Sequence, residues 1–138
     1  MKKIILVFCL FFVGQGCLAT SARVTYIIDG DTFVGDVILP DKTEVKSVKI
    51  RLRNVDTPEL HGKCESEIKR AKYAKQRLSE LIPVNSIVEI KNVKNDKYAG
   101  RIDANVFDSA NRDIGQVLIK EKVGRAYSGG KRKSWCNN

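Results

Sequence analysis

The chain has 138 residues, of which 43% are hydrophobic and 30% charged. It is too short for a Rossmann domain with a second substrate domain or for an α/β barrel, and too apolar for a disordered tail. Its 25 Lys and Arg against 16 Asp and Glu give a net charge of +9, which favours a polyanionic partner: nucleic acid, anionic lipid or an acidic protein. Its single histidine excludes two-histidine zinc sites within one chain.

The first 22 residues have the three-part pattern of a secretory signal peptide. Two lysines precede the apolar run of residues 4–13, and glycines and small residues follow it. The run is too short to cross a bilayer, which takes about 20 residues. Small residues predict cleavage after Ala19 or Ala22, and lipidation at Cys17 is a less favoured alternative. We expect a bacterial protein that is periplasmic or secreted, with no stable membrane association after cleavage.

Removal of the signal peptide leaves residues 23–138 as a single domain with two cysteines, Cys64 and Cys136. An even pair in an exported chain predicts a disulfide, which would tie the C-terminal tail to the middle of the chain. The alternative is a zinc ion on His61 and the two cysteines, but three ligands without a paired Cys-x-x-Cys spacing are a weak zinc pattern.

Five β-rich runs are separated by turn signals. Residues 24–28 and 32–39 are divided by an Asp-Gly-Asp turn, and residues 45–55 alternate between apolar and basic side chains. Residues 86–93 and 101–107 form the fourth and fifth runs. The alternation in the third run is typical of a strand with one buried face and one basic outer face.

Two further segments have helical periodicity. Residues 65–82 carry apolar side chains three or four positions apart and end at Pro83. A second helix is predicted to begin at Asp113, whose spacing to Gln116 is that of a capping box, and to stop at Gly124. Three strands, a helix, two strands and a helix in a small, basic, all-antiparallel domain predict a mainly β (α+β) fold, the five-stranded OB-fold barrel. Other α+β arrangements of these elements stay open from the pattern alone.

Acidic and basic residues gather in three turns. Asp29 and Asp31 flank a glycine, and Arg51 precedes a turn that contains Asp56 and Glu59. A third turn holds an Asp-Lys-Tyr run followed by Gly-Arg. Taken one at a time, each is an ordinary turn or a solvated strand end.

In combination, the three turns resemble the staphylococcal nuclease (thermonuclease) family of secreted, calcium-dependent nucleases with an OB-fold core. The matching runs have the family's order and family-like spacings, and they are residues 28–32 (IDGDT), 50–59 (IRLRNVDTPE), and 96–98 (DKY) with Gly100 and Arg101. The resemblance extends over roughly residues 24–127. The second run is its most specific part.

The resemblance implies a metal site and a base. Asp31, Asp56 and the backbone carbonyl of Thr57 would bind one Ca²⁺, with Asp29 as a supporting acid. Glu59 would activate the attacking water. Oxygen ligands are those that Ca²⁺ prefers, so the residue types agree with the implied ion.

The resemblance also implies how substrate is bound. Arg51 and Arg101 would grip the scissile phosphate, for which planar guanidinium forks are well suited. Tyr98, Tyr127 and Lys97 would contact the nucleotide. The implied activity is an endonuclease that hydrolyses DNA and RNA with little sequence specificity, prefers single strands and leaves 3′-phosphate ends. We expect a monomer.

Three departures from the family pattern bear on these roles. Ala99 is an extra residue that could displace Tyr98, Tyr127 stands alone where the founding member has two tyrosines, and the chain lacks that member's third helix. We expect the predicted disulfide and Trp135 to replace the bracing of that helix. The alternative functions are an OB-fold module that binds nucleic acid without cleaving it and, less favoured, a protein that binds anionic surfaces.

Overall fold

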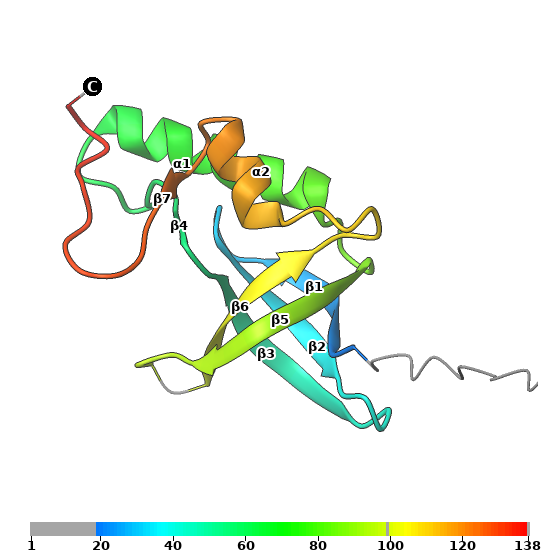
Figure 1. Ribbon diagram of the computed structural model, residues 1–138. Helices are drawn as coiled ribbons and strands as arrows, with labels where there is room; N and C mark the ends of the chain where they lie inside the picture. Colours follow the sequence, from blue (N-terminus) through cyan, green and yellow to red (C-terminus); the bar gives the residue numbers. More distant parts are fainter. Residues whose placement is uncertain (1–18, 99, 138) are drawn as a thin grey trace, which may run out of the picture.

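Five strands close into a β-barrel, and two helices lie over one end of it (Figure 1). The structure, a computed structural model, describes residues 19–98 and 100–137, so residues 1–18 of the predicted signal peptide lie outside it. In chain order the elements are β1 (Ser21–Ile27), β2 (Thr32–Ile38), β3 (Glu44–Leu52), β4 (Val55–Asp56), α1 (Glu65–Leu81), β5 (Ile87–Asn95), β6 (Arg101–Phe107), α2 (Ile114–Lys120) and β7 (Arg125–Ala126). The predicted barrel with two helices is confirmed.

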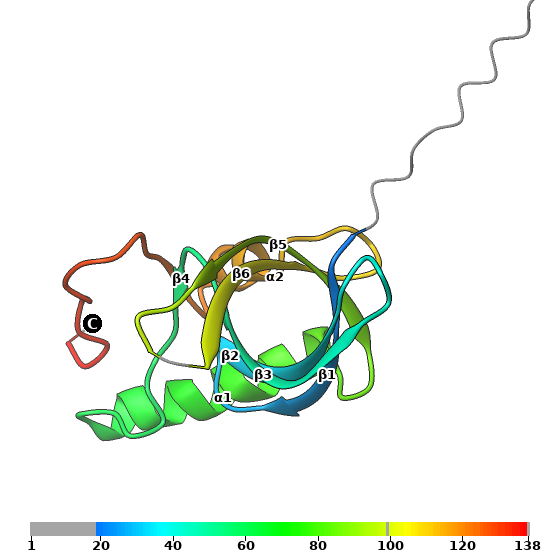
Figure 2. The same ribbon diagram turned by 90° about the horizontal axis from the view of Figure 1, so that it is seen from below.

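The strands follow the order β1-β2-β3-β6-β5, and β5 pairs with β1 to close the ring (Figure 2). All neighbouring strands are antiparallel except β3 and β6, which run parallel with Ile50 opposite Ile102. The expectation of an all-antiparallel barrel is therefore wrong. The reason is one of parity, because an odd number of strands cannot alternate in direction all the way round a closed ring.

The apolar faces of the strands and helices fill the barrel. In β3, Ile50 and Leu52 are buried while Lys49 points to solvent, as the alternation predicts. The helix α1 buries Ala74 and Leu78 in this core. No helix in the described part of the chain is both long and apolar enough to cross a membrane.

The start of α2 agrees with the prediction, but its end does not. The carboxylate of Asp113 accepts a hydrogen bond from the Gln116 N–H at 3.2 Å. The helix ends at Lys120 and the chain turns at Lys122, which has a φ of 60°. A Cβ at Gly124 would lie 2.6 Å from a methyl group of Val55. Glycine is required there by close packing, not to stop the helix.

The predicted third strand is split in two. Asn54, with a φ of 64°, ends the barrel strand β3, and the next two residues form β4, which pairs with β7. This small sheet brings the C-terminal residues beside Asp56.

A disulfide then joins Cys64 to Cys136, with 5.9 Å between their Cα atoms, and this confirms the predicted pairing. It holds the tail against the start of α1 (Figure 1), and Trp135 of the tail is buried at 6% exposure.

Candidate active site

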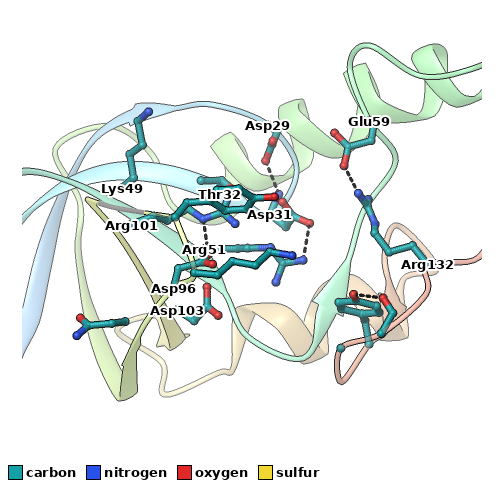
Figure 3. Close-up of a pocket in the computed structure, with 16 residues that line it drawn as sticks. Asp29, Asp31, Thr32, Lys49, Arg51, Glu59, Asp96, Arg101, Asp103 and Arg132 are labelled. Atoms are coloured by element: carbon teal, nitrogen blue, oxygen red, sulfur yellow. Dashed lines mark hydrogen bonds and ion pairs between the residues drawn. The ribbon is translucent and has the colours of Figure 1, made fainter.

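A cleft of about 920 Å³ opens on the barrel wall beside the C-terminal tail and is lined by acids and cations together (Figure 3). Eight of the predicted site residues line it: Asp29, Asp31, Arg51, Glu59, Lys97, Tyr98, Arg101 and Tyr127. The predicted metal site has two further residues, Asp56 and Thr57. Both are buried, and neither lines the cleft.

The turn between β1 and β2 places Asp31 at the floor of the site. A Cβ at Gly30 would lie 2.6 Å from the Cβ of Ala74 and 2.8 Å from Thr57 Oγ1, so only glycine lets the turn pack under α1. Asp29 accepts a hydrogen bond from the Asp31 N–H at 3.1 Å, which fixes the turn.

The carboxylate of Asp31 lies between the barrel and the Thr57 backbone. Its Oδ2 accepts a hydrogen bond from the Thr57 N–H at 3.2 Å and lies 3.7 Å from Arg51 Nη2. Burial, and then the nearby charge of Asp29, raise the pKa of Asp31 to about 7, although Arg51 acts in the opposite direction. The site therefore strongly disfavours an uncompensated charge on Asp31, as expected of a carboxylate that needs a cation.

The two predicted phosphate-binding arginines come from adjacent parallel strands. The β3–β6 register pairs Lys49 with Arg101 and Arg51 with Asp103. Arg51 also donates to the Val55 carbonyl at 3.3 Å, so its guanidinium is anchored at the end of β3. Because side chains two positions apart share a face of a strand, this register brings both arginines to the cleft.

Asp96 holds Arg101, and Asp103 lies beside Asp96. Asp96 accepts a hydrogen bond from Arg101 Nε, and this contact lowers the pKa of Asp96 even though burial opposes it. The neighbouring Asp103 is affected in the opposite way, since burial and the charge of Asp96 raise its pKa. One carboxylate oxygen of Asp103 has no hydrogen-bond partner among the described residues.

Glu59 reaches the cleft from the loop before α1. Its side chain is half exposed and forms an ion pair with Arg132 of the tail (Figure 3). Buried Glu67 supports the loop, because it accepts hydrogen bonds from the Lys63 N–H at 2.9 Å and the Glu59 N–H at 3.4 Å.

Asp56 lies beneath the tail. Its Oδ2 accepts a hydrogen bond from Trp135 Nε1 at 3.1 Å, and its Oδ1 lies 2.5 Å from Arg132 Nη2. Apart from this ion pair, Oδ1 has no hydrogen-bond partner among the described residues. The same Nη2 donates to the Thr57 carbonyl at 3.2 Å.

Two tyrosines stand at the edges of the cleft. Tyr98 is 58% exposed, and the guanidinium of Arg101 lies 4.7 Å from its ring centre. Tyr127 lies 5.9 Å from the guanidinium of Arg51, and its hydroxyl donates to the Gly130 carbonyl at 2.6 Å. Both tyrosines therefore face the cleft beside the arginines.

Comparison with known families agrees with this arrangement. The model for staphylococcal nuclease homologues matches residues 49–135, more than half of the chain. The chain belongs to the staphylococcal nuclease homologues. Asp29 and Asp31 lie before the matched range, so their place in the site rests on the turn geometry alone. A search of curated proteins gave no match.

Sequence reasoning gave no site role to several residues that line the cleft of this staphylococcal nuclease homologue. They include Asn95, Asp103 and Arg132. Arg132 belongs to a tail segment for which the sequence leaves open a flexible basic tail or a loop that wraps phosphate. The structure instead places its guanidinium on Asp56 and Glu59. The only signal was a cation four residues before Cys136, which a disulfide would bring near the acidic loop.

Proposed function

We propose that this chain is an exported, Ca²⁺-dependent endonuclease that hydrolyses phosphodiester bonds of DNA and RNA with little sequence specificity. One observation carries the proposal: a single cleft in which the carboxylates of Asp31 and Glu59 lie near the guanidinium groups of Arg51 and Arg101 (Figure 3). A module that only bound nucleic acid would gain nothing from carboxylates there, since they repel phosphate.

The donor set fits Ca²⁺. Asp31 and Asp56 offer carboxylate oxygens and Thr57 offers a carbonyl, which are hard donors of the kind that Ca²⁺ prefers. Asp56 Oδ1 is buried and pairs with a cation, the guanidinium of Arg132 at 2.5 Å, and the raised pKa of Asp31 also favours a compensating cation. Bound there, the ion would supply positive charge beside the phosphate oxygens. Two carboxylates suit the affinity of extracellular calcium sites, about 10⁻⁴–10⁻³ M.

Side chains of the protein would bind the phosphate and accept the proton of the attacking water. The guanidinium forks of Arg51 and Arg101 would bind the non-bridging oxygens of the scissile phosphate and stabilise the charge that develops on them. Glu59 would accept a proton from water as its oxygen bonds to phosphorus. The bond from phosphorus to the 5′-oxygen would break, that oxygen would take up a proton from solvent, and a 3′-phosphate would remain.

The contacts around the cleft favour a flexible substrate without sequence readout. Lys49, Lys97 and the two arginines would meet phosphates, which carry no base information. Exposed Tyr98 offers a face on which an unpaired base can stack. Single-stranded DNA and RNA are therefore the preferred substrates that we propose for a monomeric enzyme.

Export and cleavage after Ala19 are also proposals, supported by the start of the barrel. Ala22 is fully buried in β1 opposite Val88, and the Thr20 carbonyl accepts a hydrogen bond from the Ile90 N–H at 2.9 Å. Cleavage after Ala22 would remove these contacts, whereas cleavage after Ala19 keeps them. The disulfide suits an oxidising compartment.

The test is cleavage of a labelled single-stranded oligonucleotide by the oxidised chain from Thr20 onward, in Ca²⁺ or in a calcium chelator. We expect cleavage that needs Ca²⁺ and falls by at least about 100-fold in Glu59→Gln, within the range for a general base. Glu65→Gln, an exposed glutamate at the start of α1, is the matched control and should cleave like the parent. Salt-sensitive binding without cleavage would instead assign the chain to nucleic-acid binding alone.

A further inference from the structure

A guanidinium group of the tail occupies the position proposed for the metal ion. Arg132 Nη2 lies 2.5 Å from Asp56 Oδ1 and donates to the Thr57 carbonyl at 3.2 Å, while Nη1 pairs with Glu59. Ca²⁺ binds oxygens at about 2.3–2.6 Å. An ion bound by these same two oxygens would overlap with Nη2, so the ion and this position of Arg132 exclude each other.

Arg132 and Asp56 line different cavities. Arg132 lines the main cleft, whereas Asp56 lines a smaller cavity of about 470 Å³ together with tail residues such as Lys131 and Lys133. Figure 3 shows Arg132 reaching from the tail toward Glu59. One side chain therefore covers one predicted metal ligand and pairs with the predicted base.

The tail that carries Arg132 is held at both ends. Three residues later, Trp135 is buried and donates to Asp56, with the guanidinium of Arg125 stacked 3.6 Å from its ring centre. Cys136 follows, and its disulfide reaches Cys64. On the other side, the Tyr127 hydroxyl bonds to the Gly130 carbonyl. A short segment fixed in this way keeps the local concentration of the guanidinium high.

We propose that Arg132 is a built-in competitor for the metal site, which occupies the oxygens of Asp56 and Thr57 and must leave before Ca²⁺ binds. The proposal rests on the proposed function, because it concerns the same ligands. In the absence of the ion, Arg132 neutralises Asp56 and Glu59. Ca²⁺ therefore has to displace Arg132, and it binds more weakly than it would to the same oxygens without Arg132. The enzyme is then active only where Ca²⁺ is abundant.

Displacement also frees the base. The ion pair with Arg132 occupies one oxygen of Glu59, and its loss leaves that oxygen open to water. The binding of the ion and the release of Glu59 are therefore one event. Because Ca²⁺ binds only the fraction of molecules in which Arg132 has left these oxygens, its apparent affinity is lowered by that fraction, and the strength of the contact can be read from the Ca²⁺ affinity.

The test compares Ca²⁺ binding by Arg132→Gln with that of the parent chain, by calorimetry without substrate. Removal of the competitor should tighten binding by about tenfold, the gain expected if Arg132 leaves the site open in about one molecule in ten. Lys131→Gln is the matched control, because it removes the same charge from the adjacent, exposed position. It should change the affinity by less than about twofold.

A second readout uses the only tryptophan of the chain, Trp135, whose indole N–H bonds to Asp56. Its fluorescence should change on Ca²⁺ addition in the parent and, at a lower Ca²⁺ concentration, in Arg132→Gln. Equal affinities for the parent and Arg132→Gln, or an equal gain in Lys131→Gln, would overturn the competitor while leaving the metal site intact. Absence of Ca²⁺ binding in every variant would refute the metal site itself and the competitor with it.

Discussion

The buried charge of Asp31 should destabilise the metal-free protein, so replacement by asparagine should stabilise it. Burial and Asp29 raise the pKa of Asp31 from its ordinary 3.8 to about 7. A rise of about 3 units corresponds to a cost of about 4 kcal/mol for the charged form, at about 1.4 kcal/mol per unit. This net shift already includes the attraction to Arg51, so we expect Asp31→Asn to gain up to about 4 kcal/mol.

The gain should depend on pH with a defined sign. Below pH 3.8 Asp31 is protonated in the folded and the unfolded chain, and the substitution should change little. Between pH 3.8 and about 7 the unfolded chain releases the proton that the folded chain keeps, so the free energy of unfolding of the parent falls as the pH rises. Above pH 7 the full cost is present, and the advantage of Asp31→Asn should be greatest.

The assay is urea unfolding followed by Trp135 fluorescence at pH 4 and pH 8, with a calcium chelator present. Asp36→Asn is the control of opposite sign, because the Ser47 N–H and then Lys46 lower the pKa of Asp36 and stabilise its charge. Asp36→Asn should lower the free energy of unfolding at pH 8. Loss of stability in Asp31→Asn at pH 8, or an equal gain at both pH values, would refute the reasoning.

Three further predictions concern other parts of the molecule. Reduction of the disulfide between Cys64 and Cys136, which spans 72 residues, should lower the free energy of unfolding by about 2–4 kcal/mol in a thermal or urea melt; an unchanged melt would show that the bond does not brace the tail. Arg101→Lys should slow cleavage by at least about tenfold, because lysine cannot form the bidentate fork. Asp96→Asn leaves Arg101 in place and should slow cleavage less than Arg101→Lys does. Equal cleavage rates in Arg101→Lys and the parent would contradict this. Mass spectrometry of the exported protein should find that its first residue is the one directly after Ala19. A protein that begins after Ala22 would contradict this, because it would lack buried residues of β1.

Local sequence patterns were sufficient to predict the five barrel strands, the two helices and the pairing of the cysteines, but not β4 and β7. Alternation in β3, the spacing of apolar residues in α1 and the Asp113 cap depend on neighbours within a few residues. The same holds for the turns that carry the acids. The break at Asn54 was missed because an apolar–polar alternation does not reveal a left-handed backbone conformation, and that break creates β4.

The convergence of the site could not be derived from the pattern alone. The parallel pairing of β3 with β6 sets Arg51 beside Asp103 and Lys49 beside Arg101, and it follows from barrel closure rather than from any local signal. The role of Gly124 in packing against Val55 is likewise a long-range effect. The contacts of Arg132 depend on the tail's path, which the disulfide and Trp135 determine together.

The most direct test of the account joins metal binding to catalysis in one titration. Ca²⁺ is added to the oxidised chain from Thr20 onward, and the heat of binding and the rate of oligonucleotide cleavage are measured under the same conditions. Both should saturate with the same midpoint, and Asp56→Asn should abolish both. Cleavage that persists in chelator, or that saturates at a Ca²⁺ concentration where no binding is detected, would contradict a catalytic calcium site at Asp31, Asp56 and Thr57.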